Sequence, residues 1–110
     1  MYFPYVLTGF SPWMTGLVVT NLTSSVAIAD MVAMFTLTDD NGDVFTYTKT
    51  DFDTKVWAFY LDNVLVDWGW APLPGAAWLK VETNFSVDGY EFLCDGVFGA
   101  GTLPRMCYRY

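Results

Sequence analysis

The stretch that decides the fold is Val26–Thr50, VAIADMVAMFTLTDDNGDVFTYTKT. In it, two apolar runs rich in β-branched residues flank a turn-forming sequence, Asp-Asp-Asn-Gly-Asp at 39–43. An Asn-Gly pair between two such runs is the strongest short-range signal for a β-hairpin. The sequence therefore predicts two antiparallel strands joined by a tight turn, to which the remaining strands are added.

Two registers of this hairpin are compatible with the turn. A two-residue turn would place threonines opposite the aromatic residues of the returning strand. A three-residue loop with a left-handed Gly42 would instead pair Leu37 with Phe45 and Phe35 with Tyr47. We predict the three-residue loop, because it gathers the large apolar side chains on one face and the threonines on the other.

Similar short apolar runs lie on both sides of the hairpin. Strands are predicted at 3–8, 15–21, 54–61, 78–83, 89–95 and 103–110. Pro4 cannot donate a ladder hydrogen bond, so the first run is predicted to be an edge strand. The run 15–21 is apolar enough for a central position. The run 54–61 is apolar on both faces, which predicts a strand buried on both sides.

The segments between these runs predict turns and loops. A change in the alternation of apolar residues predicts a bulge near Ala29-Asp30, and turns are predicted at 9–13 and 96–101. The prolines and glycines of 69–75 predict a crossover loop, preceded by a short helical turn at 63–66. Seven to eight short strands without an amphipathic helix predict an all-β fold, either an antiparallel β-sandwich or a sheet curled towards a barrel.

The composition is unusually apolar for a chain of 110 residues. Apolar residues make up 54% and charged residues only 15%, against about 45–50% and about 25% in typical domains. A single β-sandwich domain over 1–110 leaves much of its surface in water, so part of this apolar excess is expected on the outside. Large exposed apolar patches usually mark interfaces, and we expect other copies of the chain to cover this one.

The charge of the chain argues against nucleic acid and membranes as partners. The net charge is −7, and the five basic residues are scattered along the sequence. A phosphate-binding surface needs clustered lysines and arginines. No apolar run reaches the roughly 18 residues that a membrane-spanning helix requires.

The sequence offers no recognisable catalytic or cofactor site. It contains no histidine that would activate Cys94 or Cys107 as a nucleophile. Residues 39–43 carry oxygen ligands like the start of a calcium loop, but Thr50 stands where the twelfth-position carboxylate is needed. Turn chemistry explains the same residues, so we expect no enzyme, no metal and no cofactor.

The two cysteines fall on the last two predicted strands, so a disulfide between neighbouring strands is one interpretation. Cys94 alternates with Phe92, whereas Cys107 alternates with Arg105 and Arg109. This difference in polarity predicts different faces unless a bulge shifts the register. Two reduced, partly buried thiols are the other interpretation. A disulfide would favour a location outside the cytoplasm.

Several short motifs follow one another in a particular order. They are FPYV at 3–6, TGLVVTN at 15–21, the turn at 39–43, LPG at 73–75 and DGYEF at 88–92. This order resembles a group of largely uncharacterised bacterial extracellular β-sandwich modules, in which FPYV precedes TGIxIxN, a hairpin, a crossover loop and a GF strand. The resemblance implies a β-sandwich in an extracellular or cell-surface location, and it carries over no catalytic residue. Two glycosylation sequons, at Asn21 and Asn84, fit that location.

Three tryptophans stand out because they fall in predicted loops, where an aromatic residue is least expected to be core. They are interpreted as anchors for a protein partner, as a platform for sugar rings, or as a lid over the open end of the sandwich. We expect a non-catalytic, self-associating module of an extracellular assembly such as a filament. Its expected contact residues are the loop tryptophans Trp13, Trp68 and Trp70 with the first-strand aromatics Phe3 and Tyr5. The alternative is a small carbohydrate-binding module that holds a glycan on Trp68 and Trp70.

Overall fold

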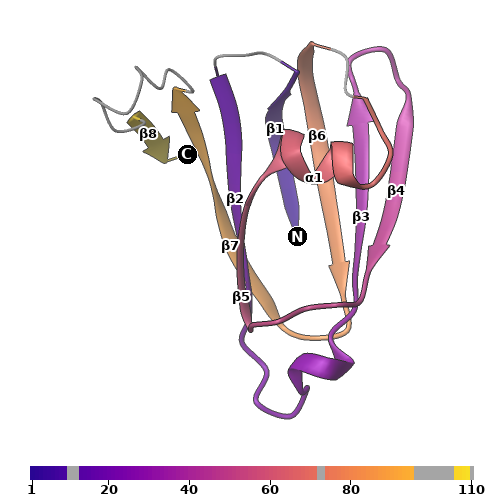
Figure 1. Cartoon of the computed structure of the whole chain (residues 1–110), viewed down its shortest axis with the longest axis vertical. Helices are drawn as coiled ribbons and strands as arrows, with labels where there is room; N and C mark the ends of the chain where they lie inside the picture. Colours follow the sequence, from indigo (N-terminus) through magenta and orange to yellow (C-terminus); the bar gives the residue numbers. More distant parts are fainter. Residues whose placement is uncertain (10–12, 72–73, 96–105, 110) are drawn as a thin grey trace.

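The computed structural model describes residues 1–9, 13–71, 74–95 and 106–109, with the backbone alone at 94–95 and 106–109. Almost all of the regular structure is β-strand (Figure 1). The strands are β1 (Tyr2–Thr8), β2 (Trp13–Asn21), β3 (Ala33–Asp39), β4 (Val44–Lys49), β5 (Val56–Tyr60), β6 (Gly75–Thr83), β7 (Val87–Asp95) and β8 (Met106–Arg109).

These strands form two four-stranded antiparallel sheets. Sheet A has the order β1-β6-β3-β4, and sheet B has the order β5-β2-β7-β8. The predicted antiparallel β-sandwich is confirmed, with two separate sheets rather than one sheet curled towards a barrel. The predictions of an edge position for β1 and a central position for β2 are also confirmed. The prediction that β5 is buried on both sides is wrong, because β5 lies at the edge of sheet B.

The hairpin formed by β3 and β4 has the predicted register and loop. Gly42 has a φ of 83°, the left-handed conformation that a three-residue loop requires. The Oδ1 atom of Asp39 accepts hydrogen bonds from the backbone N–H groups of Asn41 and Asp43, each at 2.9 Å. The loop is therefore held by its own side-chain chemistry. The two predicted pairings are present: Leu37 with Phe45 and Phe35 with Tyr47.

Three local predictions need correction. The change in alternation before β3 comes from a 3-10 helix, η1 (Ile28–Asp30), rather than from a bulge inside a strand. The predicted helical turn at 63–66 is a full α-helix, α1 (Leu61–Asp67). Trp13 is the first residue of β2 rather than part of a turn. The predicted turn at 96–101 lies outside the described residues.

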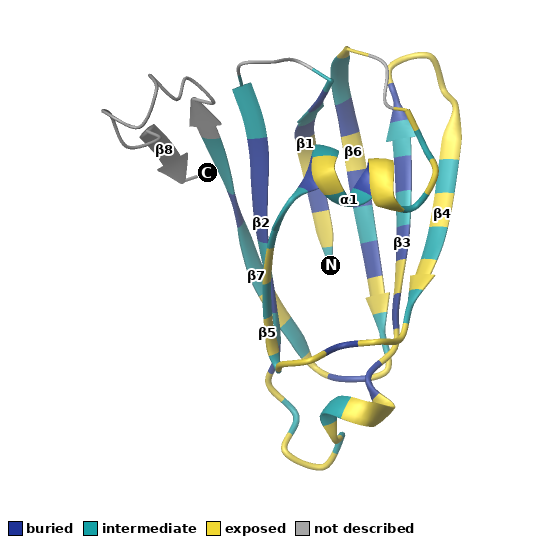
Figure 2. Cartoon of the chain, in the orientation of Figure 1, coloured by how far each residue is buried: buried dark blue, intermediate teal, exposed yellow. Residues whose placement is uncertain are grey.

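The core fills the space between the inner faces of the two sheets. Along β3, buried residues alternate with more exposed ones, as the change of colour in Figure 2 shows. Phe35 and Leu37 on sheet A and Leu17 on sheet B are each at most 2% exposed. Burial of one such side chain stabilises a fold by about 1.5–3 kcal/mol. The Thr15 hydroxyl links the sheets, since it accepts a hydrogen bond from the Leu7 N–H (2.9 Å) and donates to the Leu7 carbonyl (3.2 Å).

Candidate binding groove on sheet B

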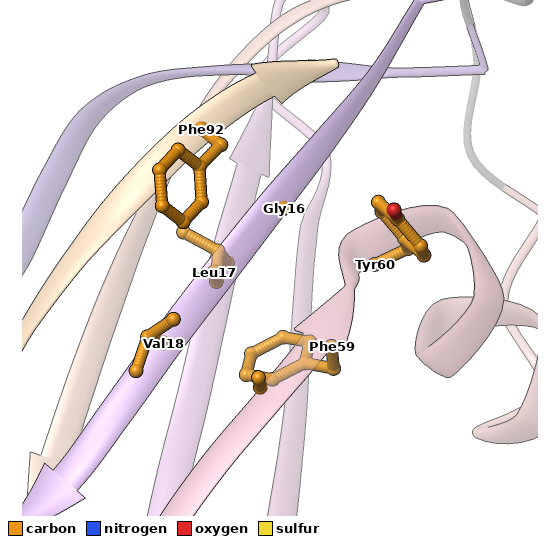
Figure 3. Close-up of a pocket in the computed structure, with 7 residues that line it drawn as sticks. Gly16, Leu17, Val18, Phe59, Tyr60 and Phe92 are labelled. Atoms are coloured by element: carbon orange, nitrogen blue, oxygen red, sulfur yellow. The ribbon is translucent and has the colours of Figure 1, made fainter. Parts of the chain in front are cut away.

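An apolar groove of about 380 Å³ lies on the outer face of sheet B, on the side opposite the core. In Figure 3 the rings of Tyr60 and Phe92 stand on either side of Gly16. Val18 and the exposed Ala58 continue the surface along β2 and β5. None of its lining residues carries a formal charge at neutral pH; they are Gly16, Leu17, Val18, Ala58, Phe59, Tyr60 and Phe92.

The groove exists because a glycine lies between two aromatic residues in the strand register. Gly16 of β2 pairs with Tyr60 of β5 on one side and with Phe92 of β7 on the other. A β-carbon at position 16 would lie 3.6 Å from the Tyr60 ring and 3.7 Å from the Phe92 β-carbon. Those are ordinary van der Waals distances, so a side chain fits there and would fill the floor. One wall is held by Tyr90, whose ring meets that of Phe92 edge-on at 5.0 Å.

The groove also explains why β5 is apolar on both of its faces. Trp57 and Phe59 pair with the core-facing Val19 and Leu17, so they lie on the inner face, although Phe59 and Leu17 also border the groove. The alternate positions carry Ala58 and Tyr60, which line the groove. The signal was present in the sequence, but two apolar faces predict a buried strand as readily as an exposed apolar surface. Only the sheet order distinguishes the two cases.

The predicted contact residues Trp68 and Trp70 do not line the groove and pack against β4. The ring of Trp68 stacks on Tyr47 with centroids 4.2 Å apart and an interplanar angle of 7°. The ring of Trp70 stacks on Phe45 at 5.2 Å and 2°. Both tryptophans are partly buried against the core cluster. They follow α1, whose Leu65 is buried, so this segment closes the sandwich beside β4 in the manner of a lid.

The other three predicted contact residues lie on β1 and β2 and differ in burial. Phe3 is 5% exposed and belongs to the core, so it is not part of the outer surface. Tyr5 is 44% exposed and lies where the β1–β6 register shifts, and Trp13 is partly buried at the start of β2. The lining of the groove includes none of the five residues. Sequence reasoning therefore missed the groove, although the Gly16 position inside an apolar strand was a signal for it.

Glu91 is an acidic residue in a core position. It pairs with Leu17 in the β2–β7 register, which places it on the inner face of sheet B, and it is 7% exposed. Its Oε2 atom is buried without a hydrogen-bond partner. Desolvation raises the pKa of this carboxyl group to about 7, from an ordinary value of 4.5. Glu91 does not line the groove, so its effect is on the stability of the sandwich.

Asp62 at the start of α1 has a structural partner. Its Oδ1 and Oδ2 atoms accept the N–H of Gly9 at 3.0 and 3.1 Å, which ties the end of β1 to the helix. Desolvation raises the pKa of the Asp62 carboxyl group, and the hydrogen bond from Gly9 opposes this. Within the described ranges, no group of three or more acidic, cysteine or histidine side chains has the arrangement of a metal site.

The asparagines of the two sequons are occupied by hydrogen bonds. Asn21 is 5% exposed, donates from Nδ2 to the Val26 carbonyl at 3.2 Å and accepts the N–H of Thr23 at 2.8 Å. Asn84 donates to the Asp30 carbonyl at 2.8 Å. Asn21 is therefore buried in its loop, whereas Asn84 is exposed, and its Nδ2 keeps a second hydrogen besides the one donated to Asp30.

The backbone register places Cys94 of β7 directly opposite Cys107 of β8. The same register places Phe92 opposite Arg109. The apolar positions of β7 and the polar positions of β8 therefore lie on the same face of the sheet. The prediction that the two cysteines occupy different faces, which was based on the polarity of their neighbours, is wrong.

Comparison of the chain with known proteins adds no relative. No protein-family model, curated protein or solved structure matches it. None of the helices in the described part of the chain is long and apolar enough to cross a membrane.

Proposed function

We propose that the protein is a non-catalytic module that associates with copies of itself through the outer face of sheet B. The observation that supports this most directly is the uncharged groove, with aromatic walls, on a chain whose net charge is −7. Exposed apolar surfaces of this kind usually mark an interface or a ligand groove. Aromatic side chains also supply a large part of the binding energy at protein interfaces.

The absence of charged residues from the groove lining is compatible with a second copy as the partner. Two molecules that each carry −7 repel one another, so the face on which they meet has to be free of like charges. The lining of the groove satisfies this condition. A basic partner would gain most from acidic loops such as 39–43, which do not line this groove.

The outer face of sheet A mixes charged, hydroxyl and exposed apolar side chains, and Met34 of β3 and Val44 of β4 are 40% and 62% exposed there. Lys80 and Glu82 of β6 form a salt bridge of 2.6 Å there, and Thr36 pairs with Lys80 on one side and with Thr46 on the other. Trp78 and Tyr2 add an exposed aromatic pair with ring centroids 6.2 Å apart. Because this face carries charged groups among its exposed apolar residues, whereas the lining of the groove carries none, we assign the self-association to sheet B.

A matched pair of charge substitutions tests this proposal. Val18→Asp places a carboxylate on the groove face, whereas Val66→Asp places the same charge on the solvent side of α1, where Val66 is 65% exposed. In sedimentation velocity at increasing concentration, we expect the wild type and Val66→Asp to form larger species and Val18→Asp to remain monomeric. Circular dichroism should show all three folded. A wild type that stays monomeric throughout would refute self-association, and equal behaviour of the two variants would refute this face.

The carbohydrate-binding alternative remains a hypothesis about Trp68 and Trp70. Trp68 stacks on Tyr47 and also meets Phe35 at 5.1 Å and Trp57 at 6.2 Å. Trp70 stacks on Phe45, so packing within the protein already uses part of both rings. This alternative predicts a change in tryptophan fluorescence when glycans are added, and loss of that change in Trp70→Ala. The self-association proposal predicts no such change.

An extracellular or cell-surface location is part of the proposal. It is supported by the order of the FPYV, TGLVVTN and DGYEF motifs. The Asn21 sequon adds no support, because Asn21 is only 5% exposed, whereas Asn84 is an exposed residue.

A further inference from the structure

The two cysteines of the chain occupy positions that suit a covalent link between neighbouring strands. Cys94 and Cys107 are the only cysteines in the sequence, and the β7–β8 register sets them directly opposite one another. Residues directly opposite in an antiparallel pair lie on the same face of the sheet. Position 94 is two residues after Phe92, which lines the groove, so both cysteine positions lie on the outer face of sheet B.

The distance between such positions matches the geometry of a disulfide. Opposite residues of antiparallel strands have α-carbons about 4.5 or about 5.5 Å apart, depending on the hydrogen-bonding pattern. Disulfides span α-carbon distances of about 4.4–6.8 Å. A bond between residues 94 and 107 therefore requires no rearrangement of the register that the backbone already has.

We infer that Cys94 and Cys107 form a disulfide that fastens β8 to the edge of sheet B. In the reaction, the two thiols lose two protons and two electrons and one S–S bond forms. The electrons pass to a small-molecule or protein disulfide, which is reduced to two thiols. Among the described residues, the bond secures a strand that pairs with four residues of β7, from Phe92 to Asp95. This inference is independent of the proposed self-association.

The function of such a bond follows from where β8 lies. A four-residue strand at a sheet edge makes few ladder hydrogen bonds and exchanges its amide protons readily. Phe92, one wall of the groove, is the first residue of β7 that pairs with β8. The disulfide therefore holds the strand that borders this wall in the register that the structure shows.

Oxidation of the full chain with oxidised glutathione tests the inference directly. After alkylation of free thiols under denaturing conditions, we expect an intact mass two hydrogens below the reduced chain, no alkylated cysteine, and a peptide map that links Cys94 to Cys107 within one molecule. We also expect this bond to form at an oxidised glutathione concentration about tenfold lower for the native chain than in guanidinium, because the register holds the thiols together. Two free thiols, stable glutathione adducts, or disulfides between molecules would overturn the inference.

A variant with a displaced thiol serves as the matched control. The double substitution Cys107→Ser and Tyr108→Cys moves the thiol by one residue to the opposite face of β8. We expect this variant to form glutathione adducts instead of an internal bond. Equal bond formation in the variant and the wild type would show that the register does not direct the reaction. Hydrogen exchange adds a second measurement: reduction should lower the protection of β7 and β8 and leave that of β3 unchanged.

Discussion

Replacing Glu91 by glutamine should stabilise the protein at neutral and alkaline pH, and the structure indicates by how much. Burial without a partner for Oε2 raises the pKa of the Glu91 carboxyl group to about 7 in the folded state, whereas the unfolded chain has the ordinary value of 4.5. Between these two pH values the folded state binds more protons than the unfolded state. The free energy of unfolding therefore decreases as the pH rises through this window.

The size of the effect follows from the difference between the two pKa values. One pKa unit corresponds to about 1.4 kcal/mol, so ionisation of Glu91 destabilises the fold by about 3 kcal/mol at pH 8 relative to pH 4. Glutamine has nearly the same shape and no charge. We expect Glu91→Gln to be more stable than the wild type by about this amount at pH 8, and the difference to shrink towards pH 4.

Guanidinium unfolding at a series of pH values, followed by circular dichroism, measures this difference. Other carboxyl groups titrate in the same range, so the decisive quantity is the difference between wild type and variant at each pH. Glu82→Gln is the control, because Glu82 is exposed on β6 and loses only a surface salt bridge with Lys80, which is worth at most about 1 kcal/mol. Parallel stability curves for wild type and Glu91→Gln from pH 4 to pH 8 would refute the buried, unpartnered state of this carboxyl group.

Three further substitutions test separate parts of the fold by the same unfolding measurement. Trp68→Ala should lower the free energy of unfolding by about 3 kcal/mol, because its ring stacks on Tyr47 at 4.2 Å; unchanged stability would contradict the lid. Asp62→Ala should cost about 1–3 kcal/mol, because the N–H of Gly9 loses both carboxylate acceptors, and Asp62→Asn should cost less. Gly42→Ala should cost about 1–2 kcal/mol at a φ of 83°. Gly42→Asn should be milder, and equal costs would contradict a purely conformational role.

The loop tryptophans show how far local sequence can predict a site. Their position in a Pro- and Gly-rich segment identified Trp68 and Trp70 as unusual, and a lid was one of three interpretations. Where the two rings pack depends on Tyr47 and Phe45, whose inner-face positions on β4 come from the hairpin register. The groove could not be predicted from local sequence. It forms because Gly16 lies between Tyr60 of β5 and Phe92 of β7, and both strands are distant from Gly16 in the chain.

The sequence by itself determined the features that depend on near neighbours. Alternation of side chains and the turn chemistry of 39–43 were sufficient for the β3–β4 register, since one residue of slip would move every apolar side chain to the wrong face. Pro4 marked β1 as an edge strand because it lacks an N–H.

Only the tertiary structure decided which strands lie side by side. The edge position of β5, the inner-face position of Glu91 and the alignment of Cys94 with Cys107 all follow from pairings between strands. In these three cases, the polarity of the side chains either predicted the wrong face or was compatible with two arrangements. The physical reason is that side-chain alternation specifies two faces but not which of them meets the other sheet. That choice depends on how both sheets together exclude water from one shared core.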